Sequence, residues 1–300
     1  MRKAILCFAH KDPVTLNTLI DQSLYKTNGH TDFYIHLDKK SEHLKDLIRK
    51  SPNVFYIQNN VSVTWGDDTM MRALVNSWKE IFSKGKDYEY FIMCTGQDLM
   101  VKSGLDEFLE NNKGGIWIDA KEGDVWRKRY IKAWWPAVIS RDLSRYPRWN
   151  YRRLIRGIYT TLVNKNIYIP RRLSYDISKL TFYYSYNWSI MPYDVFVYCY
   201  EFIRDNPDFV KMYLNTRVPE DGFLGTLIMN SPYKNDVQFN GRKDGWTATQ
   251  TYHTDIYIHP RTFDNSDIID IDNSNCYFAR KFDSAVDASI IEYYRNKVIK

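Results

Sequence analysis

The chain has 300 residues, of which 44% are hydrophobic and 26% charged, and a formal net charge of +6. These proportions are those of ordinary globular proteins, and they exclude a disordered or fibrous chain. No stretch approaches the roughly 18 apolar residues of a membrane-spanning helix. The apolar run Ala4–Ala9 after Met1–Lys3 is too short for a signal peptide. We therefore expect one domain over residues 1–300 that works in the cytoplasm.

The four cysteines are Cys7, Cys94, Cys199 and Cys276, and no two of them are spaced as C-x-x-C. Zinc sites and disulfide frameworks use paired cysteines at short, regular spacings. The spacing here predicts four free thiols.

Strands and helices alternate along the first hundred residues. Continuous apolar runs predict strands covered on both faces, and apolar residues at three- and four-residue spacing predict helices. Such alternation is typical of an α/β fold with a mostly parallel central sheet and helices on both faces. The expected elements are strand 4–9, helix 15–25, strand 32–37, helix 42–50, strand 54–57, helix 70–83 and strand 90–94.

Polar side chains follow each of these strands. In parallel sheets the ligand crevice lies beyond the carboxyl ends of the strands, so these turns predict a polar ligand. The sequence has neither a Walker-type loop nor a Gly-x-Gly-x-x-Gly turn, so side chains must hold any phosphate. The turns contain His10, Asp38, Trp65 with Gly66, and Asp98.

Residues 121–184 read as an insertion that is both basic and aromatic. From Arg127 to Arg172 there are thirteen Lys/Arg and one acid, Asp142, a local charge of +12, so the rest of the chain carries about −6. Such a mixture suits an anionic membrane surface, a nucleic acid or an acidic acceptor. A solvated basic hairpin with inward-facing aromatics is the alternative. The acid-rich tract Asp264–Asp272 is expected to be a surface loop.

Two adjacent carboxylates, Glu220 and Asp221, follow Pro219 and precede an apolar helix. At a helix N-terminus such acids often only complement the helix dipole. Beside the ligand crevice, one of them would take the proton from an attacking hydroxyl as a general base.

A leaving diphosphate can be stabilised by cationic side chains or by a bound metal ion. Arg261, in His259-Pro260-Arg261, and Lys281 offer a bidentate fork and a point charge, although both also fit a plain basic surface. Asp270 and Asp272 have the Asp-x-Asp form of a metal site, but they lie late in the chain, away from the central strands. No metal site is therefore expected.

Several motifs, in chain order from about residue 4 to 285, resemble the core-2/I-branching enzymes, glycosyltransferase family 14. That resemblance implies a GT-A-type nucleotide-sugar-binding fold, a UDP-sugar donor, inversion at the anomeric carbon and no metal cofactor. The motifs are Ala9–Lys11, Ile35–Ser41, Val63–Gly66, Thr95–Asp98 and Phe278–Phe282.

The resemblance also implies roles for single residues. The family's Pro-Asp-Glu turn has its acids exchanged here, so Asp221 holds the position of the base, with Glu220 as its rival. Arg261 and Lys281 match the diphosphate-binding cations, Asp38 the acid near uracil and ribose, and His10 the wall of the nucleotide pocket.

Further positions follow from the same motifs and from aromatic chemistry. Trp65, Gly66 and Asp98 lie in matching strand-end turns and are assigned to the nucleotide-sugar site. Trp188 is expected at the acceptor site, because aromatic faces pack against sugar rings, although buried aromatics are often plain core. Arg129 lies in a stretch, Trp126–Tyr130, that resembles an acceptor-binding segment.

The sequence thus predicts a metal-independent, inverting glycosyltransferase. The expected donor is UDP-N-acetylglucosamine, with UDP-xylose and UDP-glucose as alternatives, and the acceptor a glycan or lipid-linked glycan in surface polysaccharide synthesis. Residues 127–172 are expected to contact the inner face of the membrane and not nucleic acid. The alternatives are a metal-dependent transferase using Asp270 and Asp272, and a non-catalytic module that binds membrane or nucleic acid.

Overall fold

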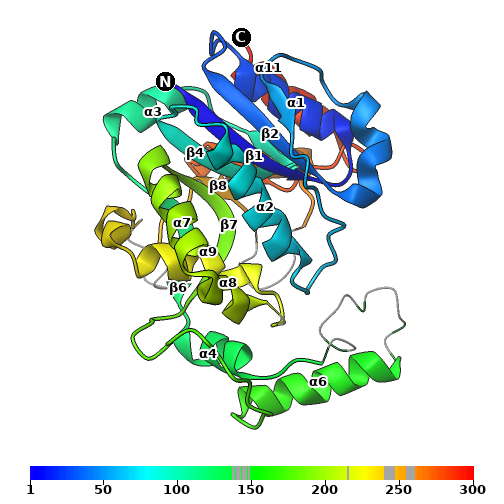
Figure 1. The fold of residues 1–300 in the computed structure, drawn as a ribbon. Helices are drawn as coiled ribbons and strands as arrows, with labels where there is room; N and C mark the ends of the chain where they lie inside the picture. Colours follow the sequence, from blue (N-terminus) through cyan, green and yellow to red (C-terminus); the bar gives the residue numbers. More distant parts are fainter. Residues whose placement is uncertain are drawn as a thin grey trace.

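A six-stranded sheet forms the centre of the protein (Figure 1). The computed structural model describes residues 1–136, 139, 143, 147, 149–214, 216–239, 247–254 and 261–300, without the side chains of 124–127. The strand order is β3-β2-β1-β4-β7-β6, and only β7 runs against its neighbours. The strands are β1 (Lys3–Ala9), β2 (Thr31–Leu37), β3 (Val54–Tyr56), β4 (Tyr90–Thr95), β6 (Trp117–Glu122) and β7 (Tyr183–Pro192).

Strand β1 lies in the middle of the sheet and is buried along its whole length. It pairs in parallel with β2 on one side and with β4 on the other. A strand covered on both faces is apolar without alternation, which is the pattern of Ala4–Ala9. The carboxyl ends of these three strands therefore lie together at one edge of the sheet.

Helices cover both faces of this sheet, as Figure 1 shows. On one face α1 (Pro13–Leu24) and α11 (Ala288–Val298) share an apolar cluster with the sheet. The helices of the other face pack around Trp78 and Phe196. These are α2 (Thr69–Ser83), α7 (Tyr193–Asp205), α8 (Pro207–Tyr213) and α9 (Glu220–Met229).

A small second sheet joins distant parts of the chain. Its order is β5-β9-β8, in which β5 (Asp98–Met100) pairs antiparallel with β9 (Phe278–Arg280) and β8 (Thr251–Tyr252) pairs in parallel with β9. The turn that leaves β4 is thereby fixed against the C-terminal part of the chain. The remaining elements are α3 (Leu105–Asn111), α10 (Ile268–Asn273) and the 3-10 helices η1 (Lys39–Leu47), η2 (Pro232–Asp236) and η3 (Asn265–Asp267).

The segment between β6 and β7 projects from the sheet and carries α4 (Asp124–Lys132) and α6 (Tyr151–Asn164), at the bottom of Figure 1. Its own small cluster includes Trp135 and Val163. Arg171 joins it to the main body, because its guanidinium donates to the backbone oxygens of Leu214 and Met212 at 2.7 Å each. Carbonyls at the end of α8 are thus capped by a cation.

The predicted α/β class is confirmed, and so are the expected strands and the helices near 15–25 and 70–83. All four cysteines are free. The α-helix expected at 42–50 is wrong. There the chain forms the 3-10 helix η1 from Lys39, whose only buried residue is Ser41, so little apolar surface stabilises an α-helix.

The loop expected at Asp264–Asp272 is also wrong. Asp264 and Asp267 form a reciprocal capping box that begins η3, and α10 follows with Ile271 buried. Acidic residues near a helix start complement its dipole, so the tract favours a short helix over a loop.

The close contact between α9 and β7 gives a test of the packing. A Cβ at Gly225 would lie 2.7 Å from Ser185 Cβ, whereas a Cβ at Gly157 of α6 would meet nothing within 4 Å. We expect Gly225→Ala to lower the free energy of unfolding by about 1–3 kcal/mol through overpacking. Gly157→Ala should raise it by about 1 kcal/mol, because alanine is the better helix former. Urea denaturation of both variants measures this, and equal stability of the two would contradict the packing.

Candidate functional site

A cavity of about 460 Å³ opens at the carboxyl ends of β1, β2 and β4. One wall is made by the residues that follow these strands, including His10, Asp38 and Thr95. The other wall comes from β7 and the start of α9, with Trp188, Glu220 and Asp221 among the lining residues. This is the edge at which open parallel sheets bind ligands.

Asp38 and His10 are held at the strand ends by backbone contacts. Asp38 is 6% exposed, its amide donates to Ala9 O at 2.8 Å, and its carboxylate accepts from Lys40 N at 2.9 Å. Ser41 Oγ donates to His10 O at 2.6 Å. Burial, followed by the neighbouring Lys11, lowers the pKa of His10. The imidazole at this wall is therefore neutral near neutral pH.

His36 also lines the cavity, although it lies inside β2 and the sequence analysis did not select it. Its Nε2 accepts a hydrogen bond from Val61 N at 3.0 Å, so this nitrogen carries no proton. Burial lowers the pKa of His36. A histidine within an apolar strand ordinarily indicates core, which is why its position gave no signal.

Trp65 and Gly66 lie between the wall formed by the strand ends and the wall that contains Glu220 and Asp221. Trp65 is 44% exposed and lines the cavity. Gly66 has φ +83°, a conformation that favours glycine, and its carbonyl accepts from Val218 N at 3.3 Å. Val218 N belongs to the turn that leads into α9, so this bond positions the two predicted carboxylates.

Glu220 and Asp221 both face the cavity. The first turn of α9 is irregular there, with Asp221 outside helical geometry and Gly222 at φ +148°. Glu220 is only 9% exposed. The hydroxyl of Tyr184 donates to Asp221 Oδ2 at 3.5 Å. The structure thus brings both acids to the predicted crevice.

Asp98 lies behind the cavity and is 1% exposed. Its carboxylate accepts from Thr95 N and Thr95 Oγ1, both at 2.7 Å, and lies 3.7 Å from Arg280 Nε. The Arg280 guanidinium lies 4.1 Å above the ring of Trp188 and lines the cavity. Burial raises the pKa of Asp98 and lowers the pKa of Arg280, while each charge opposes the shift of the other.

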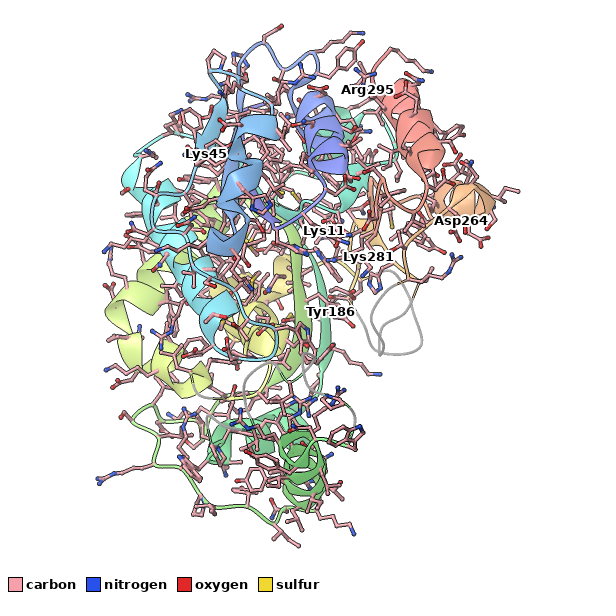
Figure 2. All side chains as sticks on the ribbon, turned by 90° about the vertical axis from the view of Figure 1, so that its right-hand side faces the viewer. Lys11, Lys45, Tyr186, Asp264, Lys281 and Arg295 are labelled. Carbon is pink, nitrogen blue, oxygen red and sulfur yellow. The ribbon has the colours of Figure 1, made fainter. Side chains whose placement is uncertain are left out.

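Lys281 follows Arg280 and lies near Lys11 (Figure 2). Burial, then the charges of Arg280 and Lys11, lowers the pKa of Lys281. Three cations, Arg280, Lys281 and Lys11, therefore lie close together, and of these only Arg280 is among the residues that line the cavity. The repulsion among them is relieved in part by Asp283, which binds Lys11 Nζ at 2.5 Å.

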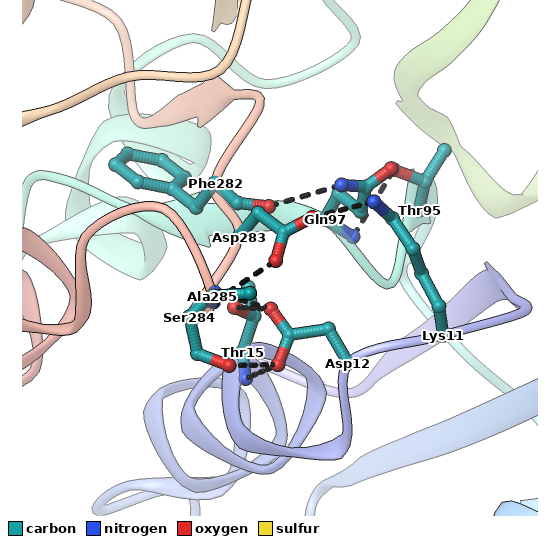
Figure 3. A network of polar contacts seen from close by, with 9 residues as sticks. All are labelled: Lys11, Asp12, Thr15, Thr95, Gln97, Phe282, Asp283, Ser284 and Ala285. Atoms are coloured by element: carbon teal, nitrogen blue, oxygen red, sulfur yellow. Dashed lines mark hydrogen bonds and ion pairs between the residues drawn. The ribbon is translucent and has the colours of Figure 1, made fainter.

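The network in Figure 3 fixes this group of cations. Asp12 begins α1 and accepts from both Ser284 N and Ser284 Oγ at 2.7 Å. Gln97 N–H₂ donates to Phe282 O at 3.1 Å, and Phe282 N donates to Gln97 O at 2.8 Å. The segment after β9 is thereby tied to the ends of both β1 and β4.

Arg261, the second predicted diphosphate ligand, has a different environment. Both of its terminal nitrogens bind the Asp267 carboxylate, and its side chain is 54% exposed. It is not among the residues that line the cavity. His259 and Pro260 lie outside the described residues.

Aromatic rings form a row along β7. Tyr184 packs edge-on against Tyr186, and Tyr186 lies 4.7 Å from Trp188 between ring centroids. His253 packs on both Tyr186 and Trp188, while its Nε2 lies 2.9 Å from the buried Asp119. This row makes the cavity a suitable place for a sugar ring.

Two further observations concern acceptor and sugar binding. Asn187 Oδ1 is buried without a hydrogen-bond partner among the described residues, although Asn187 lines the cavity. Arg129 instead donates to Asn164 O within the inserted segment.

The sequence analysis missed Asn187, Tyr186 and Arg280. The sequence did contain a sign of Arg280, because this residue lies inside the motif Phe278–Phe282.

Asp270 and Asp272, the rival metal pair, lie on α10. Asp272 accepts from the hydroxyl of Tyr294 at 3.0 Å and pairs with Lys297 at 2.7 Å, so it links α10 to α11. Across the described residues, no cluster of three or more His, Cys, Asp or Glu has the arrangement of a metal site.

A mostly parallel sheet with a polar cavity at its carboxyl edge is the arrangement in which open α/β folds bind their ligands. The family model of the core-2/I-branching enzymes matches residues 4–135. Over this part, the chain is similar to the core-2/I-branching enzymes, the family that its motifs resemble.

Comparison with other proteins adds little to this match. Among curated proteins, no sequence matches the chain significantly. A solved apo structure of the bifunctional glycosyltransferase WbbM aligns with 13% identity and a TM-score of 0.36, over 93% of this chain. The chain spans 45% of the length of that protein. A similarity of this size does not indicate a shared activity.

The two histidines of the cavity predict a pH dependence of stability. Their pKa values are lowered in the folded state from 6.5, so the unfolded state binds more protons. Stability should be complete above about pH 6.5 and fall as the pH drops below it. His36→Gln keeps an acceptor for Val61 N but does not titrate. We expect the loss of Tm between about pH 7.5 and 5.5 to be smaller in His36→Gln than in wild type, and an equal loss would contradict the role of His36.

Proposed function

We propose that the protein is an inverting glycosyltransferase that moves a sugar from a UDP-sugar to a glycan hydroxyl without a metal ion. One observation carries this proposal, namely that carboxylates and a buried guanidinium line the same cavity. The carboxylates are those of Glu220 and Asp221, and the guanidinium is that of Arg280. A displacement at an anomeric carbon needs both, because a proton is removed on one side and a diphosphate leaves on the other.

The proposed base is Asp221, with Glu220 as the rival. The carboxylate takes the proton of the acceptor hydroxyl while the acceptor oxygen bonds to the anomeric carbon. The bond from that carbon to the diphosphate oxygen breaks at the same time, and its electron pair leaves with UDP. Tyr184, which donates to Asp221 Oδ2, keeps the carboxylate oriented toward the cavity.

The leaving diphosphate gains negative charge, and fixed cations stabilise it in the transition state. Arg280 and Lys281 are proposed for this role, with Lys11 beside them. Burial makes the charge of Lys281 costly in the absence of an anion, and it accordingly lowers the pKa of this lysine. Arg261, engaged by Asp267, would join them only by exchanging its partner.

For the substrates we propose UDP-N-acetylglucosamine as donor and a glycan or lipid-linked glycan as acceptor, in surface polysaccharide synthesis. Asp38 and His10 would contact the nucleoside at the strand ends. The ring row of Tyr186 and Trp188 would receive a sugar, and Asn187 Oδ1 would accept a bond from one of its hydroxyls. UDP-xylose and UDP-glucose are alternative donors.

The carboxylates give the first test. We expect Asp221→Asn to lower kcat for transfer by about 10²–10⁴-fold, the usual contribution of a general base. UDP affinity should change little, because the nucleotide contacts lie on the strand-end wall. Glu220→Gln is the matched comparison, and a larger loss there would assign the base to Glu220. Full activity in both variants would exclude this mechanism.

Slow hydrolysis of UDP-sugars in EDTA tests the metal-free chemistry, because it needs no acceptor. We expect the wild type to release UDP from one donor, and Lys281→Ala to lose about tenfold or more of that rate. Asp272→Asn, which alters only the link between α10 and α11, should retain it. Activity that appears only with Mn²⁺ and disappears in Asp272→Asn would favour the metal-dependent alternative instead.

A further inference from the structure

Helix α6 exposes an apolar stripe along one side. Tyr151, Leu154, Ile155, Ile158 and Leu162 are 59%, 62%, 48%, 55% and 36% exposed. Their spacing of three and four residues places them on one face of the helix. In α1, by comparison, Leu16, Leu19 and Ile20 are buried in the core. Among the residues that the structure describes, this stripe of α6 is therefore left exposed.

A side of α6 that flanks the stripe already carries the packing of the helix. Val163 is fully buried in the cluster of the inserted segment, and Tyr159 donates to Trp134 O at 2.6 Å. The exposed stripe is thus not the face that holds α6 to the protein. Within the described part of the chain, the stripe is therefore accessible to a binding partner.

The apolar surface continues beyond both ends of the helix. Trp149, just before the N-cap residue Asn150, is 85% exposed, and Ile167 and Ile169 beyond the C-terminus are each 57% exposed. Tryptophan and tyrosine at the edge of an aliphatic surface are typical of side chains at the boundary between lipid and water.

Charge identifies the partner. Residues 127–172 contain thirteen Lys/Arg and one acid, while the rest of the chain is net negative. An apolar helix face within a strongly basic segment has the two attractions that draw an amphipathic helix to an anionic bilayer. We propose that α6 docks the protein on the surface of a bilayer containing anionic lipid, with the stripe Tyr151–Leu162 entering the interface.

Other occupants fit less well. A second copy of the chain would bring another +12 segment against the first, and like charges oppose such a contact. A nucleic acid would satisfy the basic residues but leave Leu154 and Ile158 uncovered. The described residues include no helix long and apolar enough to cross a membrane, so the proposed contact is with the surface.

Docking would also orient the cavity. Thr160, on the side of α6 away from the stripe, accepts a bond from Arg217 Nη1 at 3.3 Å. Arg217 lies in the turn that carries Glu220 and Asp221. This step rests on the proposed function: a helix held at the bilayer would keep the catalytic turn near glycans attached to lipid. The docking itself does not depend on the activity.

Sedimentation with vesicles tests the proposal with the full chain. Wild type should bind vesicles of phosphatidylglycerol and phosphatidylcholine at low salt and bind pure phosphatidylcholine weakly. The double variant Leu154→Ser/Ile158→Ser should bind the anionic vesicles with an affinity at least about tenfold lower than wild type, because two aliphatic side chains no longer enter the interface. The matched control is Ile269→Ser on α10, an exposed apolar residue (71%) far from the basic segment, which should bind like wild type.

Several results would overturn the proposal. The first is that wild type does not bind anionic vesicles, and the second is that the double variant binds them as well as wild type does. The third is that wild type binds no vesicles but forms a dimer in ultracentrifugation, which the double variant does not form. Binding to duplex DNA but not to vesicles would favour a nucleic acid. Asp221→Asn should bind vesicles like wild type, and UDP-sugar hydrolysis is measured without vesicles, so failure of either proposal is seen separately.

Discussion

The buried pair of Asp98 and Arg280 is the constraint on which the candidate site depends. A guanidinium removed from water needs a counter-charge close by, and an Asp98 carboxylate that is 1% exposed has the same need. The pairing of β5 with β9 sets these residues opposite each other, and the ring of Trp188 covers the guanidinium. The short second sheet therefore places a fixed positive charge at the carboxyl edge of the main sheet.

Two further cations lie beside that charge. Lys281 follows Arg280 in the chain, and Lys11 is held near it by its ion pair with Asp283 and by the bond between the neighbouring Asp12 and Ser284. Like charges held together are unfavourable until an anion binds, and this is the electrostatic arrangement that a diphosphate would complete. The carboxylates enter from another part of the chain, through the turn that Gly66 O fixes at Val218.

Charge is also distributed unevenly over the whole chain. The rest of the chain is net negative, while residues 127–172 hold the excess of positive charge and, on α6, the exposed apolar stripe. Arg171 and the bond between Arg217 and Thr160 connect the two parts. A surface contact made by α6 would thus be linked to the turn that carries Glu220 and Asp221 through Arg217.

Local patterns in the sequence determined the α/β class and the strand ends. The apolar run Ala4–Ala9, the alternation with amphipathic helices and the acids after Pro219 are all short-range signals, and they suffice because strand ends in a parallel sheet converge at one edge. They placed His10, Asp38 and the carboxylates Glu220 and Asp221 at a common crevice, and the structure brings these residues together.

Only the tertiary structure decided which other groups share that crevice. Arg280 reaches it because β9 pairs with a strand some 180 residues earlier in the chain, and Arg261 does not line it because Asp267 takes its guanidinium. His36 and Asn187 lie within strands, where periodicity gives no sign that a side chain faces a ligand. Long-range pairing and competition between charges depend on where distant residues meet, and no spacing along the chain records that.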